Sequence, residues 1–272
     1  MEFPTRPGDK LESVDFQDTI INKDFSNFRI EWCRGKSIKF QNCNFHSALF
    51  RLCYFHKASF VNCDFTGSIF VDSNLRGATF EQCKFHYSQF KSTQVDLSQI
   101  EKNLPEWENC RRELLRNLRK NAESIGEVDD VRRAFALEME SAHEHWRNAC
   151  KQPSQYYKSH YKGFQGKFYA WKNRISLLTQ KYYWGYGESP LRLMFFTVLI
   201  LLIFSLMLRP VNVVEKELNF YTKFTSLFLS TLGGKSSILE NRSQIFLCLF
   251  SLFRLASIGL FAATVVRRLA RR

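Results

Sequence analysis

The stretch CNFHSALFRLCYFHKASFVNCDFTGSIF, residues 43–70, carries a large apolar side chain at every fifth position. From Ile20 to Ile100 the same register is apolar at 16 of 17 positions, 11 of them Phe, and Gly35 is the exception. A second register, two residues earlier, holds mostly Cys, Ala, Ser and Thr. A period of five fits neither the 3.6-residue period of a helix nor the two-residue period of a strand. The backbone is therefore expected to turn a corner at each unit.

Four such corners would close one square coil, with one large and one small side chain inside each face. Successive coils would stack like parallel strands, about 4.8 Å apart. This register resembles the pentapeptide-repeat family, whose pattern has Leu or Phe at the centre, a small residue two places before it, and often Asp or Asn between. Three triplets match that pattern in full: Cys43-Asn44-Phe45, Cys63-Asp64-Phe65 and Ser73-Asn74-Leu75. The resemblance implies a right-handed quadrilateral β-helix of about four coils over residues 20–103, with residues 1–19 as a cap.

The net charge of +13 lies almost wholly in the second part of the chain. Residues 1–103 carry 13 basic and 12 acidic side chains, which leaves 26 basic against 14 acidic in residues 104–272. Some pentapeptide-repeat proteins resemble duplex DNA by presenting an acidic face, and a repeat domain at +1 lacks the charge for that role. We expect no nucleic-acid partner, and we expect the repeat domain to serve as a rigid scaffold or ligand platform.

Five cysteines fall in the small-residue register: Cys33, Cys43, Cys53, Cys63 and Cys83. A free Cys inside a coil acts as a small apolar filler. No pair has the two-to-four-residue spacing of a zinc site. The sequence opens without the pattern of a signal peptide, so the repeats are expected in the reducing cytoplasm, where disulfides are disfavoured. No nucleophile, base and orienting group come together in the sequence, so no enzyme, metal site or cofactor is predicted.

Two segments link the repeats to the C-terminal part. Residues 104–155 have helical composition and predict an αα-hairpin, broken at Ile125-Gly126. Residues 156–190 interleave Tyr, Phe and Trp with Lys and Arg. Such a segment can bind single-stranded nucleic acid, but directly before an apolar run it is more typical of a segment that lies on the anionic headgroups of a bilayer.

The last segment, residues 191–272, contains long apolar runs that predict membrane spans at 191–208 and 243–266. Each is long enough to cross a hydrocarbon core of about 30 Å. The Arg-rich C-terminus and the basic segment before the first run place both termini in the cytoplasm by the positive-inside rule. The protein is therefore expected to be a multi-pass protein of an inner (plasma) membrane, in contact with the lipid bilayer.

The segment 219–237 is predicted to be a re-entrant pore loop. A short semi-apolar stretch is followed by Ser230, Thr231, Leu232, Gly233 and Gly234, and Gly-containing backbone at membrane depth is tolerated only where protein shields it or water lines it. The order of span, short helix, filter-like strand and span resembles the two-helix, potassium-channel-like pore domain. That resemblance implies a pore filter at Ser230–Gly234. Lys235 lies at the predicted pore mouth, where the family has an acidic residue, and the aromatic residue of the family's filter is missing. The sequence therefore does not predict which ion is selected.

Arg254 lies near the middle of the second predicted span. An unpaired charge at that depth is expected to line a water-filled lumen, and packing against backbone carbonyls is the alternative. One re-entrant hairpin per chain cannot enclose a pore, so a homo-oligomer, a tetramer, is expected.

The prediction is an oligomeric ion channel for potassium or another monovalent ion. Its cytoplasmic β-helix would regulate the channel or serve as a scaffold, and it would be available to bind a ligand or a protein partner. Two alternatives stay open: a membrane-anchored scaffold whose pore-like domain does not conduct, and an anion or non-selective pore that depolarises a bacterial membrane in stress or defence.

Overall fold

A computed structural model describes residues 9–183, 185–187, 189–207, 220–231 and 244–270. The chain divides into two compact units, Met1–Ala170 and Trp171–Arg272, and the boundary falls within a helix.

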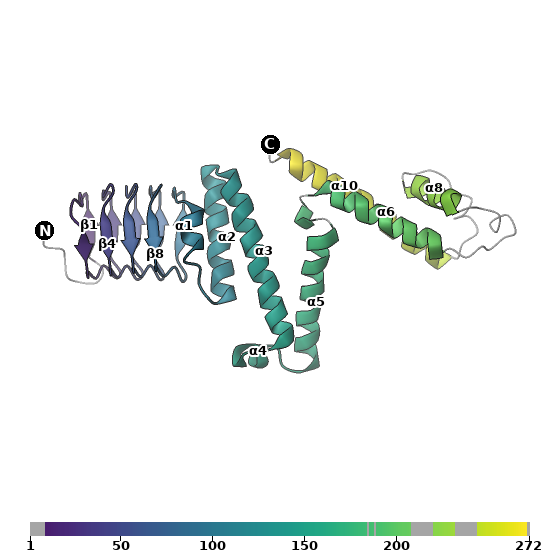
Figure 1. Cartoon of the computed structure of the whole chain (residues 1–272), viewed down its shortest axis with the longest axis horizontal. Coiled ribbons are helices and arrows are strands. Elements are labelled where there is room, and N and C mark those ends of the chain that lie inside the picture. Colours follow the sequence, from purple (N-terminus) through teal and green to yellow (C-terminus); the bar gives the residue numbers. More distant parts are fainter. Residues whose placement is uncertain (1–8, 184, 188, 208–219, 232–243, 271–272) are drawn as a thin grey trace. The chain divides into compact units, whose positions relative to one another are not determined.

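The first unit begins with nine short parallel strands in two sheets, seen stacked in Figure 1. The sheet orders are β1-β3-β5-β7-β9 and β2-β4-β6-β8. The strands are β1 (Lys10–Glu12), β2 (Ile20–Ile21), β3 (Arg29–Glu31), β4 (Lys39–Gln41), β5 (Leu49–Arg51), β6 (Ser59–Val61), β7 (Ile69–Val71), β8 (Thr79–Glu81) and β9 (Gln89–Lys91). Isolated parallel bridges, such as Asn44 with Asp64, join the coils between these sheets.

The predicted β-helix is confirmed as a β-solenoid of about four turns. It begins earlier than the sequence predicted, because β1 pairs with β3 and both Leu11 and Phe16 are buried in the core. Part of the stretch 1–19, predicted as a cap, therefore belongs to the first coil.

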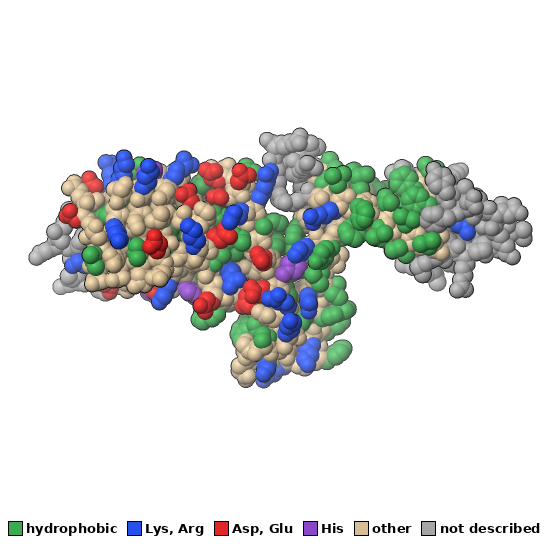
Figure 2. Space-filling model, viewed as in Figure 1, with side chains coloured by type: hydrophobic (Ala, Val, Ile, Leu, Met, Phe, Trp, Pro, Cys, Tyr) green, Lys and Arg blue, Asp and Glu red, His purple; other side chains and the backbone are tan. Residues whose placement is uncertain are grey.

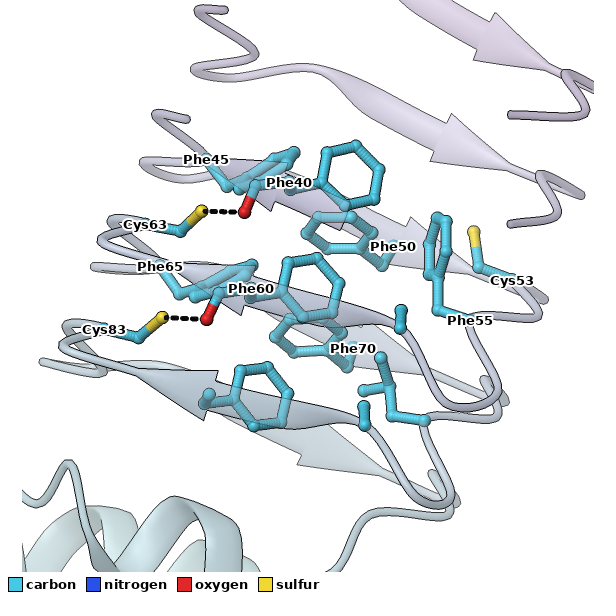
Figure 3. Close-up of a cluster of buried hydrophobic side chains, with 14 of the residues drawn as sticks. Phe40, Phe45, Phe50, Cys53, Phe55, Phe60, Cys63, Phe65, Phe70 and Cys83 are labelled. Atoms are coloured by element: carbon cyan, nitrogen blue, oxygen red, sulfur yellow. Dashed lines mark hydrogen bonds between the residues drawn. The ribbon is translucent and has the colours of Figure 1, made fainter. Parts of the chain in front are cut away.

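The interior is a stack of Phe rings (Figure 3). Phe40 and Phe60, paired in register on neighbouring coils, have ring centroids 5.1 Å apart and nearly parallel planes. Rings from adjacent faces meet edge to face, as Phe40 does with Phe45 at 5.5 Å. Such aromatic pairs add about 0.5–1.5 kcal/mol each beyond the burial of their area. The Phe side chains that recur at every fifth residue thus form one continuous hydrophobic core.

The Asp or Asn that precedes the central Phe shapes the corner. The side-chain oxygen of Asn44 accepts a hydrogen bond from the backbone N–H of His46 at 3.0 Å. Asp64 accepts one from the N–H of Thr66 in the same way. This turn, in which an Asx side chain bonds the backbone two residues on, explains why the family pattern favours Asp and Asn there.

The last coil ends against helices. After α1 (Leu97–Glu101) come α2 (Glu108–Ile125) and α3 (Val128–Lys151), joined through Gly126, whose φ is 80°. The backbone N–H groups of Cys83, Phe90 and Thr93 donate to the side chains of Asn103, Asn117 and Asn121. These asparagines replace the next coil, so the edge of the solenoid is not left open to another strand.

The predicted αα-hairpin is present, with Leu114 and Leu118 of α2 buried. The large apolar side chains of α3 are not its most buried ones. Phe135 and Trp146 are only half-buried, and the buried positions are small or polar: Ala134, Glu138, Ser141, Ala142 and Ala149. Small side chains allow close packing against the bulky leucines of α2.

The hairpin is followed by α4 (Gln155–His160) and α5 (Gly163–Tyr183), which runs from the first unit into the second. The second unit continues with a 3-10 turn η1 (Gly185–Gly187) and the helices α6 (Pro190–Met207), α8 (Phe220–Thr231) and α10 (Gln244–Ala270). Within it, α6 packs against both α8 and α10. Hydrophobic side chains cover much of the visible face of α6 and α10, whereas the β-helix face carries mixed charges (Figure 2).

The predicted spans 191–208 and 243–266 fall on α6 and α10, except for Leu208 and Ser243, which lie outside the described residues. Among the residues that the structure describes, no helix reaches the combined length and apolarity that a membrane span requires.

Candidate functional site

The predicted filter is described only at its start. Ser230 and Thr231 lie in the last turn of α8, both buried, rather than in the extended backbone that the sequence predicted. Their hydroxyls donate to the carbonyls of Leu227 and Phe228, at 2.7 and 2.6 Å. Ser and Thr side chains in a helix commonly donate to a carbonyl three or four residues earlier in this way. The rest of the predicted filter and mouth lies outside the described residues: Leu232, Gly233, Gly234 and Lys235.

Arg254, predicted to line a pore, lies in a groove of about 440 Å³ inside the second unit. The groove is formed where α8 and α10 both pack on α6. Its lining comes from all three helices: Leu193, Met194, Thr197, Val198, Phe228, Thr231, Arg254, Ser257, Ile258 and Phe261. A pore lumen would need several copies, so the lumen position of Arg254 stays a prediction.

Three hydroxyls accompany Arg254 in the groove. Thr231 donates within α8, and Thr197 donates to the carbonyl of Leu193 at 2.8 Å within α6. Ser257 is only 8% exposed, and its Oγ has no hydrogen-bond partner among the described residues. The sequence indicated Arg254 by its charge in an apolar run, but it gave no signal for Ser257, because the groove exists only when the three helices meet.

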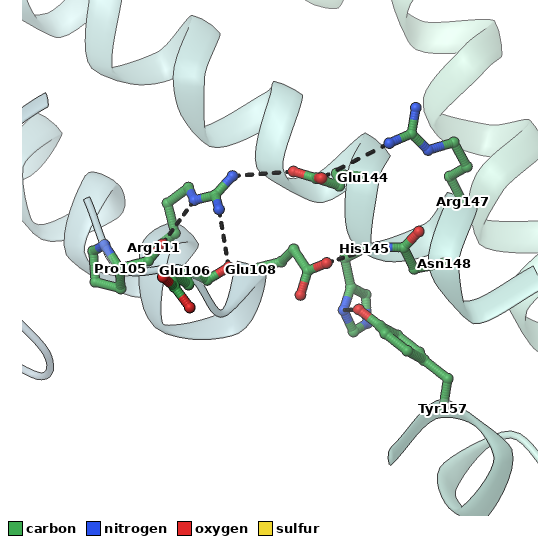
Figure 4. Close-up of polar contacts among 9 residues, drawn as sticks. All are labelled: Pro105, Glu106, Glu108, Arg111, Glu144, His145, Arg147, Asn148 and Tyr157. Carbon is green, nitrogen blue, oxygen red and sulfur yellow. Dashed lines mark hydrogen bonds and ion pairs between the residues drawn. The ribbon is translucent and has the colours of Figure 1, made fainter. Parts of the chain in front are cut away.

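A polar cluster in the first unit was not predicted (Figure 4). The imidazole of His145 on α3 lies between two tyrosines, with Nδ1 3.2 Å from the hydroxyl of Tyr157 and Nε2 3.1 Å from that of Tyr161. Asn148 donates to the carboxylate of Glu108 at 2.7 Å. Burial, the largest cause, lowers the pKa of His145. Burial also raises the pKa of Tyr157, and the negative charge of Glu108 raises it further. The neutral imidazole thus joins α4 to α3.

Ion pairs also join α2 to α3. Glu138 of α3, almost fully buried, accepts from the Nε atoms of Arg116 and Arg119 of α2, both at 3.1 Å. Arg111 of α2 bonds Glu144 of α3 at 3.0 Å. A buried carboxylate is tolerated only when paired in this way. These contacts are structural, and they orient the hairpin that closes the β-helix.

The five repeat cysteines are all buried and free, as predicted for interior fillers. Their thiols donate to main-chain carbonyls of the preceding coil, as Cys53 does to Ile30 at 3.1 Å. Burial raises the pKa of Cys53 to about 12, which keeps this thiol protonated. In the described part of the chain, no group of three or more His, Cys, Asp or Glu side chains is placed to hold a metal ion.

The comparisons with known proteins bear on the repeats. Residues 33–104 match the family model described as "Pentapeptide repeat region". These residues form a pentapeptide repeat region. No curated protein matches the chain.

Among solved structures, the chain is similar to a trypsin-treated form of QnrB1, "a plasmid-mediated fluoroquinolone resistance protein", at 22% identity and a TM-score of 0.29. That match covers 33% of this chain and 47% of QnrB1, so the chain spans about half the length of that protein. A pentapeptide repeat protein of the Arabidopsis thaliana thylakoid lumen matches at 19% identity, covering 35% of this chain and 74% of its own, with a TM-score of 0.20. Rfr23 of the cyanobacterium Cyanothece 51142 matches at 13% identity, over 32% and 69%, with a TM-score of 0.15.

Proposed function

We propose that several copies of this protein associate in a lipid bilayer through α6, α8 and α10 and form a path for monovalent ions. The pentapeptide repeat region would stand in the aqueous phase as a regulatory or scaffold domain. The tetramer, the inner membrane and the cytoplasmic position of both termini belong to this proposal.

The observation that carries the proposal is the exposure of apolar side chains on these helices. On α6, Leu191, Phe195 and Leu206 are 73, 64 and 71% exposed, and on α10 Leu252 and Leu255 are 60 and 68% exposed. In water an apolar surface of this extent would drive aggregation. In a bilayer it would be covered by lipid and by further copies of the chain.

Helix α5 supports the same location. Phe164, Phe168, Trp171 and Ile175 follow the spacing of one helical face and are 85, 53, 56 and 40% exposed. Lysines and one arginine are interleaved with them along the helix: Lys167, Lys172, Arg174 and Lys181. Exposed aromatics beside cations suit a helix that lies in the headgroup layer of an anionic membrane.

Reconstitution tests conduction directly. The purified protein would be placed in vesicles of phosphatidylcholine and phosphatidylglycerol in a KCl gradient, and the reversal potential would be measured in a fused planar bilayer. We expect currents in the wild type, and a shift of the reversal potential toward the potassium value in Lys235→Asp if ions pass the predicted filter mouth. Lys172→Gln, which removes a charge on α5, should cause no shift. Membrane-bound protein without current would refute the ion path.

A second candidate function, a membrane-attached platform for a protein partner, is favoured by a surface patch on the β-helix. Trp32 and Tyr54 are 54 and 40% exposed, although both are large aromatics. Arg34 forms a parallel backbone β-bridge with Tyr54 on the next coil, and it is also exposed. Trp, Tyr and Arg are the residues that dominate the centres of protein interfaces.

Site-specific photocrosslinking tests this platform. A photoreactive amino acid at position 54 should give a discrete crosslinked species in cells, whereas the same group at exposed Lys57, which lies outside the patch, should not. Equal crosslinking at both positions, or none at position 54, would count against a dedicated partner surface.

A further inference from the structure

We propose that the groove between α6, α8 and α10 binds an anionic amphiphile, whose carboxylate or phosphate group pairs with the guanidinium of Arg254 while its acyl chain lies along the apolar wall. This inference goes beyond the proposed function and requires no conduction of ions. It rests on three features of the groove: its volume and apolar lining, the unpartnered hydroxyl of Ser257 beside Arg254, and its lack of acidic residues.

The volume and the lining of the groove suit a small ligand. A volume of about 440 Å³ lies within the range of about 300–1,000 Å³ that is usual for ligand sites. Most of the lining is apolar, with Val198 from α6, Phe228 from α8 and Phe261 from α10 on its walls. Such sites combine an apolar body with a few polar groups that fix the orientation of the ligand.

Two of the polar groups of the groove lie on α10. Arg254 and Ser257 both line the groove and are three residues apart, hence neighbours on one helix face. The hydroxyl of Ser257 is buried without a hydrogen-bond partner among the described residues. Burying a hydroxyl without a hydrogen-bond partner is unfavourable, so its presence indicates a group that supplies the missing bond. An anionic head group would accept hydrogen bonds from both side chains.

The described part of the second unit contains no acidic residue that could pair with Arg254. Residues 171–183, 185–187, 189–207, 220–231 and 244–270 contain no Asp or Glu. No ion pair of Arg254 occurs among the described residues either. A guanidinium in apolar surroundings is stabilised when an anion pairs with it, and carboxylate and phosphate match its planar donors best. An apolar chain joined to such an anion satisfies both parts of the groove.

Binding can be measured with cis-parinaric acid, a fatty acid whose fluorescence rises in an apolar site, added to the full-length protein in a neutral detergent. We expect saturable binding that Arg254→Gln weakens about ten- to a hundredfold, the loss of one charged hydrogen-bonded pair. Arg254→Lys should retain part of the affinity. Val198→Trp, which fills the groove without changing its charge, should abolish binding. Arg192→Gln, which removes an exposed arginine of α6, serves as the matched control and should bind like the wild type.

Competition identifies the source of the ligand. Displacement by phosphatidylglycerol would indicate a bilayer lipid, and displacement by palmitate alone would indicate a free fatty acid; both support the site. Phosphatidylcholine that competes as well as phosphatidylglycerol, or inorganic phosphate that competes as well as palmitate, would overturn it. So would wild-type affinity in Arg254→Gln, with unchanged helix content by circular dichroism. The assay reports binding alone, so absence of ion flux leaves its result unaffected.

Discussion

The side chain of Asn121 makes a pair of hydrogen bonds with the backbone of Thr93, accepting from its N–H at 2.8 Å and donating to its carbonyl at 2.7 Å. Asn121 is on α2, and Thr93 is in the last coil of the β-helix. The amide group therefore takes the place of the peptide group that a further coil would supply. The edge of the solenoid, which would otherwise be open, is closed by a side chain of the helical hairpin that follows it in the same unit.

Replacing Asn121 by Ala should loosen the last coil. Both bonded groups of Thr93 would lose their partners in a buried setting, at a cost of roughly 1–3 kcal/mol for each group. Hydrogen exchange of peptides covering residues 85–95, followed by mass spectrometry, should show a matching drop in protection. Lys120→Ala, at an exposed neighbouring position of α2, should leave these peptides unchanged. Equal protection in both variants would mean that the coil does not depend on this cap.

Replacing Phe60 by Ala should destabilise the repeat region by about 3–5 kcal/mol, the usual cost of emptying a buried aromatic position. Phe60 is 1% exposed and lies between the stacked rings of Phe40 and Phe80. The free energy of opening would be read from hydrogen exchange of β6. Tyr54→Ala, in the same coil but at the surface, should change it by no more than about 0.5 kcal/mol. A small effect of Phe60→Ala would show that neighbouring coils can collapse into the space.

The stability of the hairpin should decrease below neutral pH through His145. Burial lowers the pKa of His145 in the folded protein below its ordinary value of about 6.5. As the pH falls below 6.5, the unfolded chain binds a proton that folded His145 does not, so the free energy of unfolding falls by at most about 1.4 kcal/mol per pH unit. The fall ends when the pH reaches the lowered pKa.

Thermal unfolding followed between pH 7.5 and 5 would measure this dependence. His145→Gln should be less stable at pH 7.5 and should lose the acid-dependent part of the decrease. His46→Gln, at an exposed corner of the β-helix, should behave like the wild type. A pH profile that is identical in wild type and His145→Gln would exclude His145 as its cause.

The repeat cysteines should resist alkylation in the native protein. Cys33, Cys43 and Cys53 are no more than 2% exposed, and burial raises the pKa of Cys53 to about 12, so little thiolate is available. Iodoacetamide at pH 8, with the sites located by peptide mass spectrometry, should modify the half-buried Cys150 before any of the repeat cysteines. All cysteines should react after unfolding in guanidinium chloride. Rapid native modification of the repeat cysteines would indicate that the coils open.

The β-helix could be predicted from the sequence because each of its contacts repeats. A Phe that fills one face meets another Phe one coil later, so the register of Phe40, Phe60 and Phe80 carries the tertiary packing within the local pattern. The αα-hairpin was predictable for a similar reason, since Gly126 and the leucines of α2 mark its turn and one of its faces. The exact start of the first coil could not be predicted, because β1 lies where the five-residue register is incomplete.

The remaining features depend on contacts between distant residues that no local period encodes. Asn121 meets Thr93, His145 meets Tyr157, and Ser257 joins a groove with Thr197 only because separate helices pack together. The sequence by itself determined the solenoid, its Phe core, its buried cysteines and the apolar character of α6 and α10. Tertiary structure alone decided how the solenoid is capped and where Arg254 lies, because a side chain's partners across a helix interface are set by packing geometry rather than by its neighbours in the chain.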